Sequence, residues 1–134
     1  MGAPGVRDNF EHQEDLQGAQ GCPIRDVLNR IGDQWTLLVL GALSKKTLRF
    51  NELKREIGDV SQHMLARTLK RLEEDGLVSR TLFPVIPPRV DYALTPLGQS
   101  LLQPLDILIA WANAHHRVIL DARRNYGRGH VEGA

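Results

Sequence analysis

The sequence predicts a mainly α-helical domain that carries one small β-hairpin. Apolar residues recur at helical spacing in five segments between residues 22 and 124. One pair of strand-like runs interrupts them, on either side of the stretch PVIPPR. The chain has 134 residues, which is close to the usual size of one compact domain. We therefore expect a single folded domain rather than several.

The expected domain spans residues 22–124, with a flexible tail on each side. Residues 1–21 are polar and acidic, rich in Gly and Gln, and lack the apolar core of a secretory signal. Residues 125–134, which end in GRGHVEGA, form the second expected tail. No apolar run reaches the ~20 residues that cross a bilayer. The single cysteine excludes an internal disulfide, so we expect a cytoplasmic protein.

The first two helices are predicted from their caps. Pro23 suits the first helical position, so Cys22 is the expected N-cap and Gly32 marks the end of the helix. Asp33 is expected to cap the next segment, QWTLLVLGALSK, which is apolar on nearly every side. This segment is the expected central helix. Its interior Gly41 costs ~1 kcal/mol relative to Ala, which suggests a closely packed neighbouring backbone.

A second pair of helices follows a short extended piece, KTLRF. The first of them, NELKREI, ends at Gly58. Ser61 is the expected N-cap of the second, QHMLARTLKRLEED, and Gly76 stands just after its end. One face of this longer helix is an apolar stripe made of Leu65, Leu69 and Leu72. At about 100° per residue, the opposite face is polar and carries His63, Arg67, Lys70 and Glu74.

The remaining residues predict a two-stranded ribbon and a long helix. The runs LVSRTLFPV and RVDYALT are the arms of the ribbon, and Pro87 and Pro88 stiffen the connection between them. Arg89 gives the tip of this ribbon a positive charge. The last helical pattern begins at residue 96, and Pro104 inside it predicts a kink or a restart.

Two helices joined by a tight turn and followed at once by a hairpin predict a helix-turn-helix with a wing. In this arrangement the N-terminal part of the second helix enters the major groove of double-stranded DNA. The residues expected to reach that groove are Ser61, Gln62, His63, Ala66 and Arg67. We expect Lys70 and Arg71 to meet phosphates, and Arg89 to project into the adjacent minor groove.

The chemistry of these side chains suits a duplex. Gln62 can form two hydrogen bonds to adenine, and Arg67 can bind guanine or grip a phosphate. Basic charge is also concentrated here, since residues 45–89 hold ten Lys or Arg and six Asp or Glu. Two alternatives remain: the polar face is an ordinary solvated surface, or the winged helix is a protein-interaction module without DNA specificity. A steep fall of DNA affinity with salt distinguishes DNA binding from both.

The sequence shows no pattern typical of an enzyme. It has no Gly-rich phosphate loop, no paired acid motif and no Ser-His-Asp arrangement. A thiol-dependent enzyme built on Cys22 lacks an evident base. His115 and His116 are adjacent in a helix, so their side chains diverge by about 100° and need outside ligands to hold a metal ion. We therefore expect no catalytic activity, cofactor or metal site.

Short motifs occur in a fixed order from Cys22 to Trp111: CPI, IGDQW, RFNEL, LEEDGLV and PPRVDYALTPLG. In combination they resemble the HxlR-type family of bacterial transcriptional regulators, within the MarR-like superfamily. The resemblance implies a winged-helix homodimer that binds a pseudo-palindromic operator, often as a repressor. It implies a recognition helix at residues 61–75, a wing at residues 81–93, and a dimer contact made by the N- and C-terminal helices.

The closing helix also predicts a dimer on physical grounds. Its apolar stripe consists of Leu101, Leu105, Leu108, Ala112 and Ile119. A domain of this size does not easily cover so much apolar surface alone, and a large exposed apolar patch usually marks an interface. A two-fold dimer would place two recognition helices about one DNA turn apart, roughly 34–36 Å. The alternative is that this helix folds over its own core.

Cys22 is the expected site of a redox switch. A helix N-terminus and Arg25, one turn on, both favour the thiolate form, which is the form that oxidants attack. Some members of the family that the chain resembles sense quinones, aldehydes or oxidants through a cysteine at this position. The resemblance thus implies an oxidant or small-molecule effector. The alternative is an inert, half-buried cysteine chosen for its size.

Overall fold

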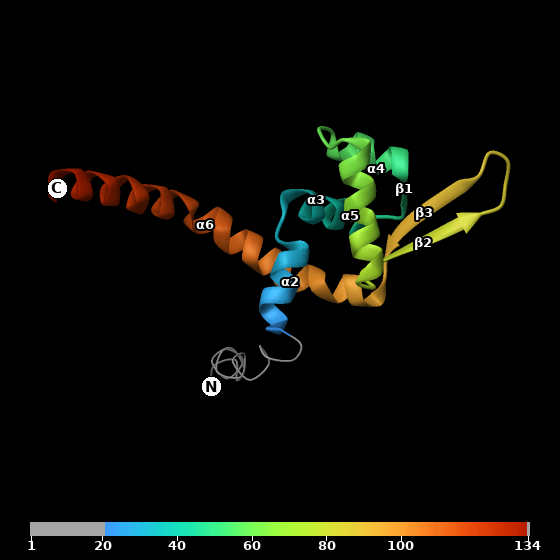
Figure 1. Cartoon of the computed structure of the whole chain (residues 1–134), viewed down its shortest axis with the longest axis horizontal. Helices are drawn as coiled ribbons and strands as arrows, with labels where there is room; N and C mark the ends of the chain where they lie inside the picture. Colours follow the sequence, from blue (N-terminus) through green and yellow to red (C-terminus); the bar gives the residue numbers. More distant parts are fainter. Residues whose placement is uncertain (1–20, 134) are drawn as a thin grey trace. The chain divides into compact units, whose positions relative to one another are not determined.

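The computed structural model describes residues 21–133, with side chains described up to residue 129. Its elements occur in the predicted order (Figure 1): α2 (Pro23–Ile31), α3 (Gln34–Leu43), β1 (Leu48–Arg49), α4 (Phe50–Ile57), α5 (Gln62–Glu74), β2 (Val78–Phe83), β3 (Arg89–Leu94) and α6 (Pro96–Gly133). The mainly helical fold with a small antiparallel sheet is confirmed. Residues 1–20 of the predicted N-terminal tail lie outside the described residues.

The chain divides into two compact units, one ending at Gly98 and the other beginning at Gln99. The second unit is the continuation of α6. This helix has 38 residues and contains Pro104 without ending there, so of the two outcomes predicted at this proline, a kink or a restart, the restart is not observed. Residues 125–133, which we expected to be a tail, form the last part of the same helix.

The caps of the first unit follow the sequence signals. The Asp33 carboxylate accepts hydrogen bonds from the backbone N of Thr36 at 2.8 Å and from its hydroxyl at 3.0 Å. The Ser61 hydroxyl accepts one from the backbone N of Met64 at 3.1 Å. Gly76, with φ of 75°, follows α5 in the left-handed conformation that glycine adopts at little cost. The helix bounds are therefore fixed largely by local interactions.

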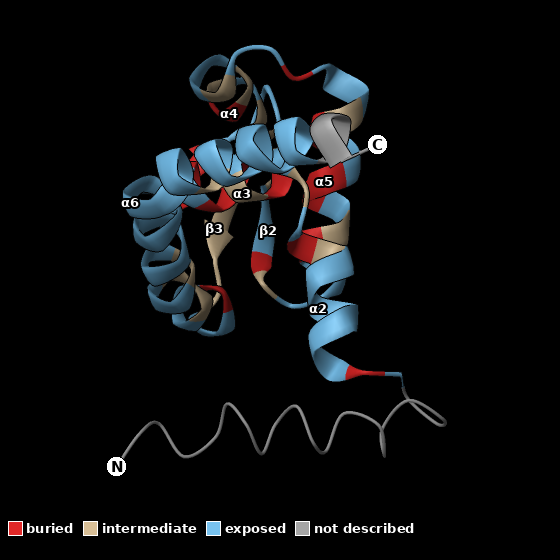
Figure 2. Cartoon of the chain, turned by 90° about the vertical axis from the view of Figure 1, so that its left-hand side faces the viewer, coloured by how far each residue is buried: buried red, intermediate tan, exposed pale blue. Residues whose placement is uncertain are grey.

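The core is formed mainly by leucines of α3, α4 and α5. Figure 2 shows the buried residues gathered on these helices and at the start of β2, whereas α2 is mainly exposed. The predicted stripe of α5 is confirmed, because Leu65, Leu69 and Leu72 are all nearly or fully buried. The other large side chains that are fully buried are Leu40, Leu48, Leu53 and Val39. Burial of one such side chain stabilises the fold by about 1.5–3 kcal/mol, so α5 is firmly held.

The sheet has three strands in the order β1-β3-β2, all antiparallel. The ribbon was predicted, but the pairing of its return strand with the extended piece before α4 was not. Leu48 pairs with Tyr92, and Arg49 with Asp91. Arg49 is also the N-cap of α4, and its backbone N donates to the Glu52 carboxylate at 2.9 Å. The sheet therefore fixes the first turn of α4 beside the base of the ribbon.

A compact junction joins the end of α5, the sheet and the start of α6. The Thr95 hydroxyl donates to the carbonyl O of Gly76 at 2.6 Å and accepts from the backbone N of Gly98 at 3.0 Å. The backbone N of Thr95 donates to the carbonyl O of Leu77 at 3.1 Å. Gly98 lies so close that a Cβ there would be 2.2 Å from that same oxygen. We expected a close backbone approach of this kind at Gly41, and that expectation is wrong. Apart from atoms of its own helix, no described atom would lie within 4 Å of a Cβ added at Gly41.

The C-terminal ends of α2 and α5 are tied by polar contacts. The Arg30 guanidinium donates to the Asp75 carboxylate at 2.9 and 3.1 Å and to Glu74 at 3.4 Å. The Arg71 guanidinium donates to the carbonyl O of Asn29 at 3.2 Å. The acidic end of α5 is thus partly neutralised within the chain. Such exposed pairs contribute little to stability.

Candidate nucleic-acid interface

The polar face of α5 begins at its first turn. Four of the predicted groove residues, Gln62, His63, Ala66 and Arg67, are exposed, and so is Lys70 one turn later. The buried stripe on the opposite side of the helix turns these five side chains outwards. Ser61 is exposed as well, but its hydroxyl is engaged as the N-cap. The structure thus brings together five unblocked side chains between positions 62 and 70 of α5.

Arg71 has a different environment from the one expected. It is half-buried, and its guanidinium bonds the Asn29 carbonyl of α2 at 3.2 Å. Position 71 is rotated about 100° around the helix from Lys70, and the hydrogen bond to Asn29 shows that this side of α5 faces α2. The helical spacing was known from the sequence, whereas the position of α2 was not. Arg71 therefore has a structural contact where we expected a free side chain.

Arg89 is not at the apex of the wing, the hairpin formed by β2, β3 and residues 84–88. It is the first residue of β3 and pairs across the sheet with Phe83. Its guanidinium lies 4.3 Å from the centroid of the Phe83 ring, and its Nε lies 3.2 Å from the Asp91 carboxylate. The expectation of a projecting arginine is corrected here, because an aromatic ring and a carboxylate hold Arg89 against the sheet.

The apex of the wing is apolar instead of cationic. Residues 84–88 connect the two strands, and Ile86 is fully exposed while Val85 is about half exposed. Three prolines, Pro84, Pro87 and Pro88, restrict the backbone of this segment. Figure 1 shows β2 and β3 projecting from the helices of the same unit as a long hairpin.

Positive charge gathers around the first turn of α4, a place that the sequence analysis did not single out. Arg49 and Arg55 are exposed, as is Lys46 just before β1. All three residues belong to the basic segment 45–89, and Arg49 is the first residue of the motif RFNEL. Only the pairing of β1 with β3 reveals that this turn lies next to the wing.

Cys22 is buried, with 3 % of its surface exposed. It is the N-cap of α2 as predicted, and Pro23 begins the helix, but within the described residues its side chain makes no capping hydrogen bond. The accessible thiol that we expected is therefore not observed. His115 bonds the Trp111 carbonyl and stacks on its ring. Among the residues whose side chains are described, no cluster of three or more His, Cys, Asp or Glu could hold a metal ion.

Residues 30–119 match the model of the HxlR-like helix-turn-helix family. The chain belongs to the HxlR family. Its fold and its polar recognition helix agree with this membership, so it is a winged-helix DNA-binding transcriptional regulator. The resemblance inferred from the short motifs is confirmed. No helix in the described part of this HxlR-family regulator is both long and apolar enough to span a membrane.

One related protein sequence and two solved structures illustrate what this regulator is similar to. It is 42 % identical over 105 residues to an uncharacterised HTH-type transcriptional regulator, YtfH, of Escherichia coli (strain K12), covering 78 % of this chain and 83 % of that protein. The structure of the ytfH regulator from Salmonella typhimurium matches with a TM-score of 0.67 and 40 % identity, over 79 % of this chain and 95 % of that one. Diamide-treated YodB from B. subtilis matches with a TM-score of 0.63 and 33 % identity, over 71 % of this chain and 95 % of the other.

Proposed function

We propose that this regulator binds a pseudo-palindromic operator as a homodimer and acts as a repressor in the cytoplasm. The observation that carries the proposal is the exposed polar face of α5, which is held by a buried leucine stripe in the same compact unit as the wing. In the proposal, Gln62, His63, Ala66 and Arg67 read base edges in the major groove, and Lys70 meets a phosphate. In the same proposal, Ser61, Arg71 and Arg89 mainly position α5 and the wing and contribute less to DNA binding.

Exposed apolar side chains on both terminal helices support the homodimer. On α2, Ile24, Val27 and Leu28 are 42–51 % exposed although they share one helical face. On α6, exposed large side chains include Ile107, Leu108, Ile109, Trp111 and Val118. A single chain leaves these surfaces in water, and their burial by a second copy would be favourable at about 25 cal/mol per Å².

Selection of bound sequences from random duplex DNA tests this function. We expect selected sites with two related half-sites about 10–10.5 base pairs apart, centre to centre. Light scattering is expected to give the mass of two chains, and the affinity for a selected site is expected to fall steeply with salt. A monomer at micromolar concentration would contradict the dimer. Affinity that does not depend on salt or on sequence would favour the alternative, a protein-interaction module.

We also propose that oxidation or electrophile modification of Cys22 switches DNA binding. The similarity to YodB, a regulator solved both reduced and after diamide treatment, supports this part of the proposal. Because Cys22 is buried, the N-terminal edge of α2 must open before a reagent reaches the sulfur. Two Cys22 thiols from the two subunits could then form a disulfide, giving two protons and two electrons to the oxidant.

The variant Cys22→Ser is expected to bind the operator as the wild type does and to lose the response to diamide. Serine keeps the size of the side chain and removes the only thiol in the sequence. The measurement is operator affinity before and after diamide, with mass spectrometry of the wild type to identify the product. A variant that keeps the full response would rule out Cys22 as the sensor.

A further inference from the structure

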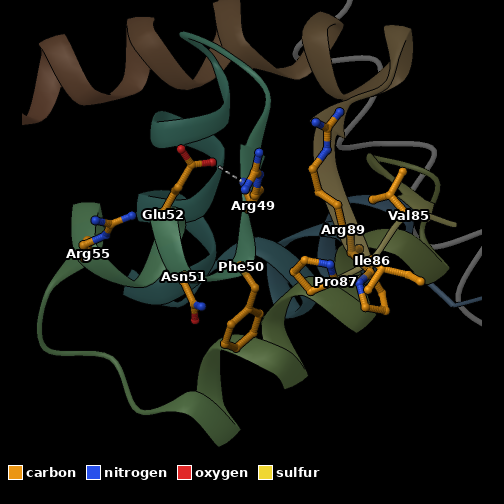
Figure 3. Close-up of a pocket in the computed structure, with 11 residues that line it drawn as sticks. Arg49, Phe50, Asn51, Glu52, Arg55, Val85, Ile86, Pro87 and Arg89 are labelled. Carbon is orange, nitrogen blue, oxygen red and sulfur yellow. Dashed lines mark hydrogen bonds between the residues drawn. The ribbon is translucent and has the colours of Figure 1, made fainter. Parts of the chain in front are cut away.

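A cavity of about 640 Å³ lies between the wing and the first turns of α4. Figure 3 shows the labelled lining residues coming from these two elements. One wall consists of residues 49–52 and Arg55, and the other of residues 85–90. Exposed residues on both walls, among them Asn51 and Pro87, open the cavity to solvent. Because both walls belong to the unit that also carries α5, the cavity has a fixed position relative to that helix.

The two walls differ in chemistry. The α4 wall is mainly polar and has a net positive charge, since two arginines stand there with Asn51, Glu52 and one aromatic residue, Phe50. The wing wall is apolar at its outer part, where Val85, Ile86 and Pro87 lie next to one another. A ligand that fits both walls has an anionic group on one side and an apolar surface on the other. The sugar–phosphate backbone of DNA has this character, because charged phosphates alternate with deoxyribose rings.

Electrostatics favour an anion on the α4 wall. Three arginines line the cavity against one carboxylate, that of Glu52. The pKa of Glu52 is lowered, first by the hydrogen bond from the backbone N of Arg49 and further by the charges of Arg49, Lys46 and Arg55. Glu52 is thus occupied as the cap of α4, and the positive charge around it exceeds its own. Arg89 contributes less to this excess, because Asp91 pairs with it.

We propose that this cavity holds the DNA strand that separates the two grooves occupied by α5 and by the wing. Arg49 and Arg55 bind phosphate oxygens of that strand, and the side chains of Ile86 and Pro87 pack on deoxyribose. One strand necessarily lies between a major groove and the adjacent minor groove. A protein with a helix in one and a hairpin in the other must therefore accommodate that strand between them. The proposal rests on the DNA-binding function proposed above.

The apex of the wing has a role in the same arrangement. Ile86 is fully exposed and is followed directly by Pro87 and Pro88, so little conformational entropy is lost when it makes a contact. Proteins that bind the minor groove frequently place apolar side chains such as isoleucine and proline in it. The wing then contributes shape and apolar contact, and the charge comes from α4.

The salt dependence of DNA affinity tests this proposal, because each phosphate contact contributes about 0.9 to the slope of log K against log salt. For Arg55→Gln we expect that slope to fall by about 0.9 per protomer, or about 1.8 for a dimer on two half-sites. The ranking of selected sequences is expected to stay unchanged, since a phosphate contact carries no sequence information. Arg55→Lys retains the charge and is expected to keep the wild-type slope.

The matched control is Arg25→Gln, which removes the same charge from exposed α2, outside the cavity. Its slope is expected to equal that of the wild type. A wild-type slope in Arg55→Gln would overturn the cavity proposal while leaving DNA binding intact. Absence of salt-dependent binding in the wild type would instead remove the proposed function itself. Saturable binding of inorganic pyrophosphate to the free protein, lost in Arg55→Gln with no change in the DNA slope, would identify a small-anion site and overturn the proposal.

Discussion

Replacing Arg67 by alanine is expected to weaken binding to a selected operator by about 1–3 kcal/mol per half-site, roughly 5- to 160-fold. Arg67 is exposed in the N-terminal half of α5, and the buried stripe on the other side of the helix directs it outwards. An arginine there can form two hydrogen bonds to one guanine. Water molecules in the alanine variant would not reproduce the geometry of these two bonds. The measurement is a binding isotherm at two salt concentrations.

The sequence preference of the variant shows what Arg67 contacts. If it reads guanine, selection with Arg67→Ala relaxes the preference at one position of each half-site. Arg71→Ala is the matched control, because it is the same residue type on the same helix but bonds the Asn29 carbonyl. We expect Arg71→Ala to lose less affinity than Arg67→Ala and to keep the sequence preference. Equal losses in the two variants would contradict the proposed orientation of α5.

The variant Gly98→Ala is expected to lose about 3 kcal/mol of stability, which corresponds to a fall in Tm of roughly 10 °C. Its Cβ would lie 2.2 Å from the Leu77 carbonyl O and 3.2 Å from the Leu94 side chain. The clashing oxygen belongs to the backbone and accepts the hydrogen bond of Thr95, so relief of the clash breaks that bond. Thermal unfolding followed by circular dichroism measures the effect.

Gly41→Ala is the control for this substitution. Gly41 lies inside α3, and apart from its own helical neighbours no described atom would be within 4 Å of the added Cβ. Alanine in a helix interior is favoured over glycine by about 0.5–1 kcal/mol, so a small rise in Tm is expected. A loss of stability at position 41 as large as that at position 98 would show that the junction is not the strained site.

The helices were predictable because their signals are local. Asp33 and Ser61 each cap a helix three residues before the amide that they bind, and the leucines of α5 repeat with the period of the helix. The exposed face of α5 follows from that same period. All four of the proposed base-reading residues could therefore be named from the sequence alone.

The environment of the arginines was not predictable, because it depends on pairs that are distant in the chain. Arg49 is paired with Asp91 in the register of β1 and β3, and Arg71 donates a hydrogen bond to the Asn29 carbonyl of α2. Neither pairing has a local signature. Arg89 was expected at the apex because it follows two prolines, yet the strand begins there and Phe83 and Asp91 hold it. The burial of Cys22 likewise depends on the fold around the start of α2.

The strand order β1-β3-β2 leaves β2 as an edge among the described strands. A six-residue edge offers backbone amides and carbonyls to which an extended chain from another molecule could add. Arg80 in its middle is exposed, and Pro84 directly after its end has no amide hydrogen to donate. A positive charge and a proline are common protections of such an edge. Here they would prevent aggregation through a hairpin that projects from the helices of its unit.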